Sequence, residues 1–587
     1  MPFVIVAIVL AAYGGYQLMR YRVIEQGIEI KTKATVPSTF AGSYLAARFA
    51  SQAGDLKAAS HYSDNALKHS GKNVALLFDS LRRFVAAGSM ERAVEAAKTM
   101  QMRESIDPLA SMVMLSHYAK EKDYKVALAA MGEGADGGLY TLVAPLFAQW
   151  LRVDYPEGAE AAPRADMEQL LTQAGFLLPF VEYHHALLLD YQGQPEEALA
   201  AFLRAKGEPD VTPYRVTQVM ANFYLRHGKK DEAQALFDAY REHHPSSGLI
   251  PTEIPDFDLK PDEIKPVVST PAEGVAELFF TTASLLFAEQ ATDEALIYLR
   301  LALYLRPDLP PAQLMLANVL EQMKDYSGAI AVYDSIDPNT VFYRRGLVRS
   351  ALNYEMLGDT KRAVSLLERY AVDYPNDIEA YSTLGDIYRS KKQFERAVQA
   401  YGAAIKRRAP WSADDWELFY ARGMSFERAG HWEKAEADFK QALSLQPKQP
   451  DVLNYLGYSW LIQDKHIKKA KRYIEQAVEQ RPYDAHIIDS MGWAHYLTGD
   501  YLLAVDYLEQ AVELAPQDAT INDHLGDAYW RVGRKIEAEF QWERALTFKP
   551  EAEDERAILQ KLEQGLPDAV LMGSAATKID EPLTATD

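Results

Sequence analysis

The sequence predicts an all-α protein, an α-solenoid superhelix of about a dozen helical hairpins. One alanine recurs at an almost constant spacing, with separations of 34, 34, 34, 38, 35, 34 and 34 residues, in the column Ala295, Ala329, Ala363, Ala397, Ala435, Ala470, Ala504 and Ala538. Glycines lie about twelve residues before five of these alanines, at Gly385, Gly423, Gly457, Gly492 and Gly526. Prolines lie twelve residues after three of them, at Pro482, Pro516 and Pro550. Small residues let two antiparallel helices approach closely, and proline falls where a hairpin ends.

The amino-terminal half repeats less regularly. Its alanines are Ala59, Ala93, Ala127, Ala198 and Ala233, and the stretch 128–197 holds one irregular unit. Five prolines between 246 and 272 forbid a helix there. We interpret this segment as an extended spacer, with a hinge or strap as the alternative. The expected organisation is a membrane anchor or signal segment at 1–22, a divergent solenoid at 40–245, a proline-rich linker at 246–272, a regular solenoid at 273–550, a capping helix at 551–566 and a disordered tail at 567–587.

Composition excludes several classes of function. The formal net charge of −21 repels nucleic acid and anionic lipid, so we expect no nucleic-acid partner. The chain has no cysteine, which excludes disulfides, thiol catalysis and cysteine-ligated metals. A partner with positive or mixed charge fits this surface better.

The amino terminus carries the only targeting information. An apolar run extends from Phe3 to Met19 and is followed by Arg20 and Arg22. Its length is at the lower edge for a spanning helix, and it also suits a secretory signal or a start codon placed too far downstream. We expect a cell-envelope protein with its repeats on the periplasmic side. The alternative is an inner-membrane protein with cytoplasmic repeats, which the two arginines favour.

The repeating pattern resembles the tetratricopeptide repeat. The residues that carry the resemblance run Leu456-Gly457, Ala470, Ala477 and Pro482, then Gly492, Tyr501, Ala504, Leu508, Ala511 and Pro516, then Leu525-Gly526, Ala538, Ala545 and Pro550. This resemblance implies that the first helix of each unit lines a concave groove through repeat positions 2, 5, 9, 12 and 13. Those positions predict a partner-binding groove formed by Tyr420, Met424, Asn454, Tyr458, His486, Asp489, Trp493, Tyr496, Asp523, Asp527, Trp530 and Arg531.

The predicted groove is rich in aromatic rings and carboxylates. Such a surface favours a basic residue or amino group on an extended or helical peptide. Some relatives of this repeat grip a terminal carboxylate with paired Lys and Asn, a pattern from which this sequence departs. Asp489 and Asp523 would repel a carboxylate.

Motifs for chemistry are missing from the sequence. There is no phosphate-binding glycine loop, no nucleophile elbow and no HExxH helix. We therefore expect no catalytic residue, no cofactor and no metal. The contrary hypothesis is an enzyme with an unrecognised site in the irregular 128–197 region.

A narrower resemblance concerns the last units. The stretches 489–493, 524–530 and 542–546 resemble the end of large bacterial envelope repeat proteins, one type of which is a lipoprotein adaptor of a carboxyl-terminal processing protease. This implies a non-catalytic scaffold whose partners are proteins or peptides, among them an envelope protease and its substrates. The chain lacks the lipid-accepting cysteine of that type. The alternative is a cytoplasm-facing regulator of an envelope biosynthetic pathway, similar to an inner-membrane repeat protein that controls lipopolysaccharide synthesis but without its cysteine-ligated metal module.

Overall fold

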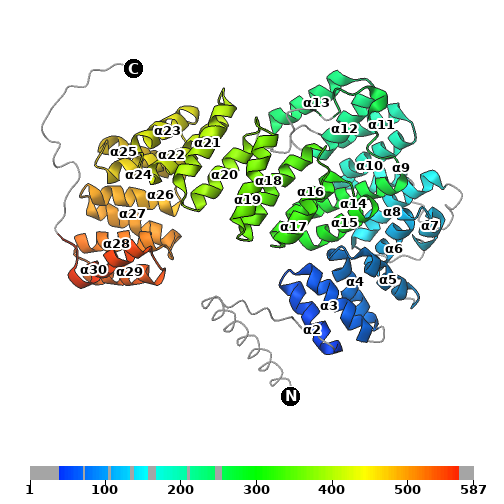
Figure 1. The fold of residues 1–587 in the computed structure, drawn as a ribbon, viewed down its shortest axis with the longest axis horizontal. Coiled ribbons are helices and arrows are strands. Elements are labelled where there is room, and N and C mark those ends of the chain that lie inside the picture. The colour runs from blue at the N-terminus through cyan, green and yellow to red at the C-terminus, as the bar shows by residue number, and fades with distance from the viewer. Residues whose placement is uncertain are drawn as a thin grey trace. The chain divides into compact units, whose positions relative to one another are not determined.

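The computed structural model describes residues 39–69, 73–103, 107–131, 138–155, 167–207, 212–244, 254 and 256–567. These residues form 29 α-helices, α2 to α30, and no strand (Figure 1). The predicted fold class is therefore confirmed. The expected anchor at 1–22 lies outside the described residues, as do 246–253, 255 and 568–587.

The chain divides into two compact units, Met1–Asn353 and Tyr354–Asp587. Paired helices fill the first unit: α2 Phe40–Gln52, α3 Leu56–His69, α4 Val74–Ala86, α5 Met90–Gln101, α6 Pro108–Lys120, α7 Tyr124–Met131, α8 Gly138–Asp154, α9 Met167–Gln173, α10 Leu178–Tyr191, α11 Pro195–Lys206, α12 Tyr214–Arg226, α13 Lys230–His243, α14 Pro271–Ala288, α15 Thr292–Leu305, α16 Pro310–Gln322 and α17 Tyr326–Tyr333. Short 3-10 turns occur at Gly175–Leu177 and Pro261–Glu263.

Helix α18, Val341–Met356, contains the division between the units. The second unit continues with α19 Thr360–Asp373, α20 Glu379–Ser390, α21 Phe394–Arg408, α22 Trp416–Arg428, α23 Trp432–Leu445, α24 Pro450–Ile462, α25 Ile467–Gln480, α26 Ala485–Leu497, α27 Tyr501–Leu514, α28 Ala519–Arg531, α29 Lys535–Thr547 and α30 Ala552–Gln564, with a 3-10 turn at Ala413–Asp415.

The alanine column is the packing seam of the hairpins. All eight alanines from Ala295 to Ala538 have no exposed surface, and each lies in the second helix of its hairpin. The glycine column lies opposite, in the first helices. A methyl group at Gly526 would come within 2.5 Å of the Trp542 indole, and one at Gly385 within 2.5 Å of the Tyr401 ring. The small residues are therefore required by close contact between paired helices.

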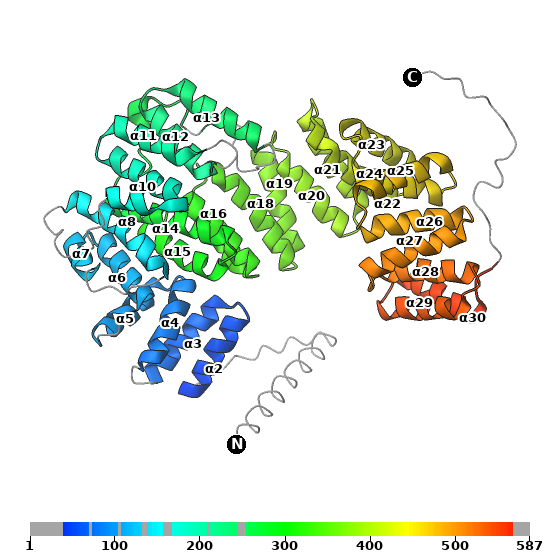
Figure 2. The same ribbon diagram turned by 180° about the vertical axis from the view of Figure 1, so that it is seen from behind.

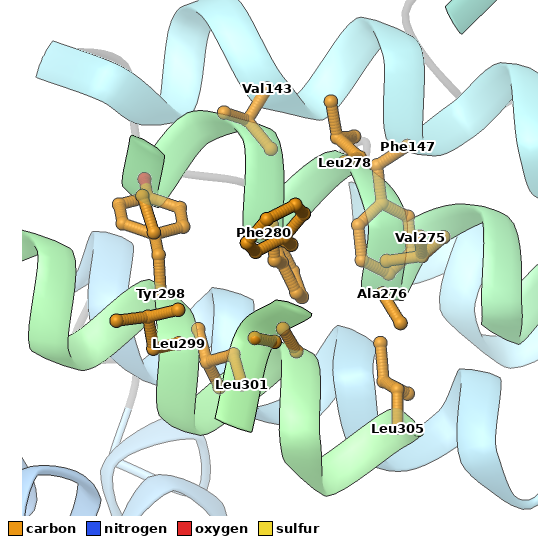
Figure 3. Packing of buried hydrophobic residues seen from close by; sticks show 14 of the residues in the cluster. Val143, Phe147, Val275, Ala276, Leu278, Phe280, Tyr298, Leu299, Leu301 and Leu305 are labelled. Atoms are coloured by element: carbon orange, nitrogen blue, oxygen red, sulfur yellow. The ribbon is translucent and has the colours of Figure 1, made fainter. Parts of the chain in front are cut away.

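In the first unit, helices far apart in the sequence pack together. Helix α14 contacts α8, and α15 contacts both α4 and α6, as Figures 1 and 2 both show. A methyl group at Gly274 would come within 2.3 Å of the Trp150 ring, and the rings of Phe147 and Phe279 are 5.8 Å apart. One buried hydrophobic cluster runs from Leu56 to Phe342 (Figure 3). Helices α14 to α17 thus belong to the first unit, whereas the sequence placed the domain boundary at 246–272.

The described part of the proline-rich segment lies on the first unit. Ile254 and Ile264 are buried against α12 and α13 in a cluster that includes Phe237. The side chain of Asn222 donates a hydrogen bond to the backbone carbonyl of Lys265 at 3.1 Å. Residues 256–270 are thereby attached to the hairpin that precedes them.

Candidate partner-binding groove

The predicted groove residues lie on the first helices of four successive hairpins in the second unit. Helix α24 contacts α26, and α26 contacts α28, while α22 contacts α24 through the rings of Tyr420 and Tyr455. Their candidate residues are Tyr420 and Met424 on α22, Asn454 and Tyr458 on α24, His486, Asp489, Trp493 and Tyr496 on α26, and Asp523, Asp527, Trp530 and Arg531 on α28.

Three aromatic rings are stacked between α26 and α28. The Trp493 ring lies 4.5 Å from the Tyr496 ring and 3.9 Å from the His524 ring, with interplanar angles of 7° and 15°. The Tyr496 hydroxyl accepts a hydrogen bond from Arg531 Nε at 3.2 Å. Because Trp493 and Tyr496 are only partly buried, the stack offers a flat, semi-apolar surface that ends in a cation.

Asp489 is paired within the protein. His524 Nδ1 lies 2.9 and 3.1 Å from the two carboxylate oxygens of Asp489, and both side chains are buried. Although burial opposes the imidazolium, the charge and hydrogen bond of Asp489 raise the pKa of His524 above its ordinary value. The pair therefore fixes the stacked ring of His524.

Asp523 and Asp527 already hold a basic residue. Lys561 Nζ lies 2.8 and 2.9 Å from the carboxylate oxygens of Asp523 and 2.9 Å from Oδ2 of Asp527. Asp527 also accepts a hydrogen bond from Trp542 Nε1 at 2.9 Å. Although burial opposes the charge of Lys561, the two aspartates raise its pKa. These acids thus bind an ammonium group, supplied by α30 of the same chain.

Helix α30 and the residues after it cover this end of the groove. Ile558 is buried in the hydrophobic cluster of the last hairpins. A methyl group at Gly565 would come within 2.2 Å of Trp530, and Arg531 donates to the backbone carbonyl of Pro567 at 2.6 Å. The terminal helix is therefore docked on α28 through both apolar and ionic contacts.

The remaining candidates lie on α22, on α24 and at the start of α26, and their side chains differ in solvent exposure. His486 is exposed, whereas Met424, Tyr420 and Tyr458 are partly buried. The Tyr420 ring packs against Tyr455 at 5.9 Å between centroids, and burial raises the pKa of Tyr458. The buried amide oxygen Asn454 Oδ1 has no hydrogen-bond partner in the described part of the chain.

A second concave site, in the first unit, was missed by the sequence analysis. Most of the residues at repeat positions 2, 5 and 9, counted from the alanines at 198, 233, 295 and 329, line or underlie one cavity of about 520 Å³, whereas Leu187 and Asn222 at position 9 do not. The lining and underlying residues are Phe180 and Tyr183 on α10, Arg215 and Gln218 on α12, Glu277, Phe280 and Ser284 on α14, and Pro311, Leu314 and Asn318 on α16. The same register that selected the second groove could have found this one.

The described residues contain neither a metal site nor a membrane-spanning helix. No group of three or more histidine or acidic side chains there is arranged to hold a metal ion. No helix between residues 39 and 567, within the described ranges, has the length and apolarity needed to cross a bilayer.

The fold defines a class, the solenoids built of antiparallel helical hairpins. More specifically, the chain contains tetratricopeptide repeats, whose profile matches residues 345–377, 378–409, 416–449 and 490–553. The resemblance to this repeat is confirmed. The narrower resemblance to envelope adaptor proteins stays a prediction.

The chain matches only parts of known relatives. A TPR repeat-containing protein of Pseudomonas aeruginosa is 26% identical over 189 residues, which are 32% of this chain and 31% of that protein. The human protein O-mannosyl-transferase TMTC1 is 25% identical over 157 residues, 27% of this chain and 18% of the transferase. The chain thus spans less than a third of the length of either relative.

Solved structures resemble the chain at low sequence identity. A tetratricopeptide repeat protein from Parabacteroides merdae is 14% identical with a TM-score of 0.37, covering 43% of this chain and 99% of its own. A chain of the APC/C hetero-tetramer Cut9–Hcn1 is 15% identical with a TM-score of 0.37. The similarity covers 90% of this chain and 97% of that chain. None of these similarities identifies a ligand or an activity of this chain.

Proposed function

We propose that this protein is a non-catalytic scaffold that binds a partner protein in the concave groove of its second unit. Tetratricopeptide repeats generally mediate protein interactions. The observation that carries the proposal is the capture of Lys561 by Asp523 and Asp527, with distances of 2.8 to 2.9 Å. These acids are built to receive a basic side chain from a helix.

The groove combines this ionic site with apolar contact. Trp493 and Tyr496 supply partly exposed rings, and His486 is exposed one turn before Asp489. Aromatic anchors beside a few charged groups are typical of surfaces that bind peptide segments. The partner we propose is an amphipathic helix or extended segment with a lysine or arginine. It contacts the open part from α22 to α26 and competes with α30 at the closed end.

Site-specific photocrosslinking tests the groove. We expect a photoreactive phenylalanine analogue in place of His486 to form a discrete adduct with one partner in cells. The matched control replaces Leu502, which is 75% exposed on the second helix α27. Adducts of the same partner from both positions, or none from position 486, would contradict the proposed groove.

We further propose that the scaffold acts in the bacterial cell envelope, with an envelope protease and its substrates among its partners. Support comes from the apolar run from Phe3 to Met19 and from the resemblance of the last units to envelope adaptors. A reporter that is active only outside the cytoplasm, fused after Asp587, tests the location. Activity supports the periplasmic assignment, and inactivity in a stable fusion favours the cytoplasm-facing regulator.

A further inference from the structure

The first unit contains a largely apolar cavity of about 520 Å³ that lies outside the groove just described. Helices α10, α12, α14 and α16 form its walls, together with the start of α18. This volume falls within the range of about 300–1,000 Å³ that is common for ligand sites. The cavity is therefore large enough for several side chains of a bound segment.

Bulky apolar side chains form the walls. Phe180, Phe280, Leu314, Met315 and Phe342 all line the cavity. Next to them, Phe176 is 92% exposed and Leu285 is 40% exposed. Exposed apolar side chains at the edge of an apolar cavity indicate a surface that a binding partner covers.

A buried ion pair makes the floor rigid. Arg215 donates to Glu277 through Nε at 2.8 Å and through Nη2 at 2.7 Å, and Glu277 is fully buried. The Tyr183 hydroxyl donates to Glu277 at 2.8 Å, and Arg215 Nη1 donates to Gln218 at 2.7 Å. Because Arg215 and Glu277 neutralise each other, the floor attracts neither sign of charge strongly.

The rim carries the uncompensated charge. Among the residues that the structure describes, Glu289 is the one charged residue besides Arg215 that lines the cavity, and it is exposed. Glu289 is the C-cap of α14, where the helix dipole adds negative potential. A ligand with a positive group at this end would be favoured over a neutral or anionic one.

Polar groups inside the cavity suit a peptide better than a hydrocarbon chain. The amides of Gln218 and Asn318 line the cavity, as does Tyr214. The amide oxygens of Gln218 and Asn318 already accept hydrogen bonds, from Arg215 Nη1 and from the Tyr333 hydroxyl, so their amide N–H groups are the donors offered to a ligand. The carbonyls of a peptide backbone can accept from them, whereas an alkyl chain offers no acceptor.

We propose that this cavity is a second binding site, which takes a peptide segment with two or more bulky apolar side chains next to a lysine or arginine. The apolar side chains fill the space between α10 and α16, and the basic residue pairs with Glu289. The site goes beyond the groove of the second unit, because its lining is formed entirely by the first unit and its recognition is mainly apolar.

A phage-displayed library of random twelve-residue peptides, selected on the full-length protein, tests the proposal. We expect a group of selected peptides with the apolar and basic pattern, whose affinity falls about tenfold or more on Ser284→Trp, since the indole fills the cavity. Glu289→Lys should weaken the same peptides about threefold, and changing their basic residue to Glu should restore binding to that variant. Asp293→Lys, an equal charge change at an exposed residue that does not line the cavity, should have no effect.

Circular dichroism first establishes that Ser284→Trp is folded. If that variant does not fold, Ser284→Phe and the charge exchange at Glu289 provide the same test. The proposal is overturned if no selected peptide is sensitive to these changes, or if 1-dodecanol competes for the cavity while no peptide does. Peptides that are insensitive to Ser284→Trp but bind near His486 belong to the second-unit groove, so the two proposals can fail independently.

Discussion

Replacing Lys561 by alanine should undock the terminal helix and open the acidic end of the second-unit groove. Lys561 forms contacts of 2.8 to 2.9 Å with Asp523 and Asp527. The substitution leaves two adjacent carboxylates without their cation, and Asp527 retains only the indole donor of Trp542. The two carboxylates would then repel each other in a partly desolvated position.

The size of the effect follows from the burial of the pair. Removing one partner of a buried ion pair costs about 3–5 kcal/mol. Lys561 and Asp523 keep 17% and 18% of their side-chain surface exposed, so we expect the lower end, about 3 kcal/mol. Since α30 contacts α29 and the hairpins of the second unit pack on their neighbours, the loss should concentrate in α28 to α30.

Hydrogen exchange and urea unfolding measure this change. Residues 552–566 should lose protection in Lys561→Ala, and the unfolding transition of the second unit should shift to lower urea. The control is Lys535→Ala on the neighbouring helix α29, an exposed residue whose Nζ lies 4.6 Å from the Trp530 ring centroid. It should change stability by no more than about 0.5 kcal/mol. Equal effects of the two variants would refute the role of the ion pair.

The two units should respond to pH in opposite directions. Burial lowers the pKa of His184 to about 4, so its contribution to first-unit stability is lost as pH falls from about 6.5 to 4, by up to about 3 kcal/mol. Burial disfavours the charged form of His524, but Asp489 raises its pKa above the ordinary value. The contribution of His524 to second-unit stability is therefore present below about pH 6.5 and is lost as the pH rises through the pKa of His524 in the folded protein. Hydrogen exchange at several pH values resolves the units, and a common direction would contradict the assignment. Separately, Gly526→Ala should destabilise the second unit by about 1–2 kcal/mol, because a methyl group there meets an indole at 2.5 Å. Gly402→Ala, whose methyl group would be 3.6 Å from its nearest neighbour, should be neutral or stabilising in urea unfolding by up to about 1 kcal/mol. Equal destabilisation by both glycine changes would show that steric contact is not the cause.

The hairpin fold was predictable because packing repeats in the sequence. Ala504 and Ala538 have no exposed surface, and Gly492 and Gly526 lie against side chains of the paired helix. Each hairpin needs small residues at the same two contact positions, so the period of the packing appears directly in the sequence.

The division into units was not predictable in this way. It depends on contacts between α8 and α14, such as that of Trp150 with Gly274, which join segments more than a hundred residues apart. A contact that occurs once leaves no period. The proline-rich segment was the strongest irregularity in the sequence, but irregular backbone does not itself separate two cores.

The helices that carry the candidate groove residues were predictable for the same reason. Trp493, Asp523 and Asp527 lie on first helices, as the register predicts, while the binding of a partner by these residues stays a prediction. The repeat register did not indicate that Lys561 would form ion pairs with Asp523 and Asp527. Helix α30 lies beyond the repeats, and its charged residues are typical of a solvent-facing capping helix. The pairing of Asp489 with His524 was likewise invisible, because His524 is not at a groove position.

Packing and recognition use different positions of one repeat, which explains why the two units differ in surface chemistry while sharing a fold. The alanine column has the same residue and no exposed surface in both, at Ala233 as at Ala504. Position 5, by contrast, is Phe280 in the first unit and Asp489 in the second. A substitution at position 5 changes what the surface attracts without altering the helix seam. The apolar cavity and the acidic, aromatic groove candidates are therefore two separate surfaces of one solenoid chain, and each can be mutated without changing the other.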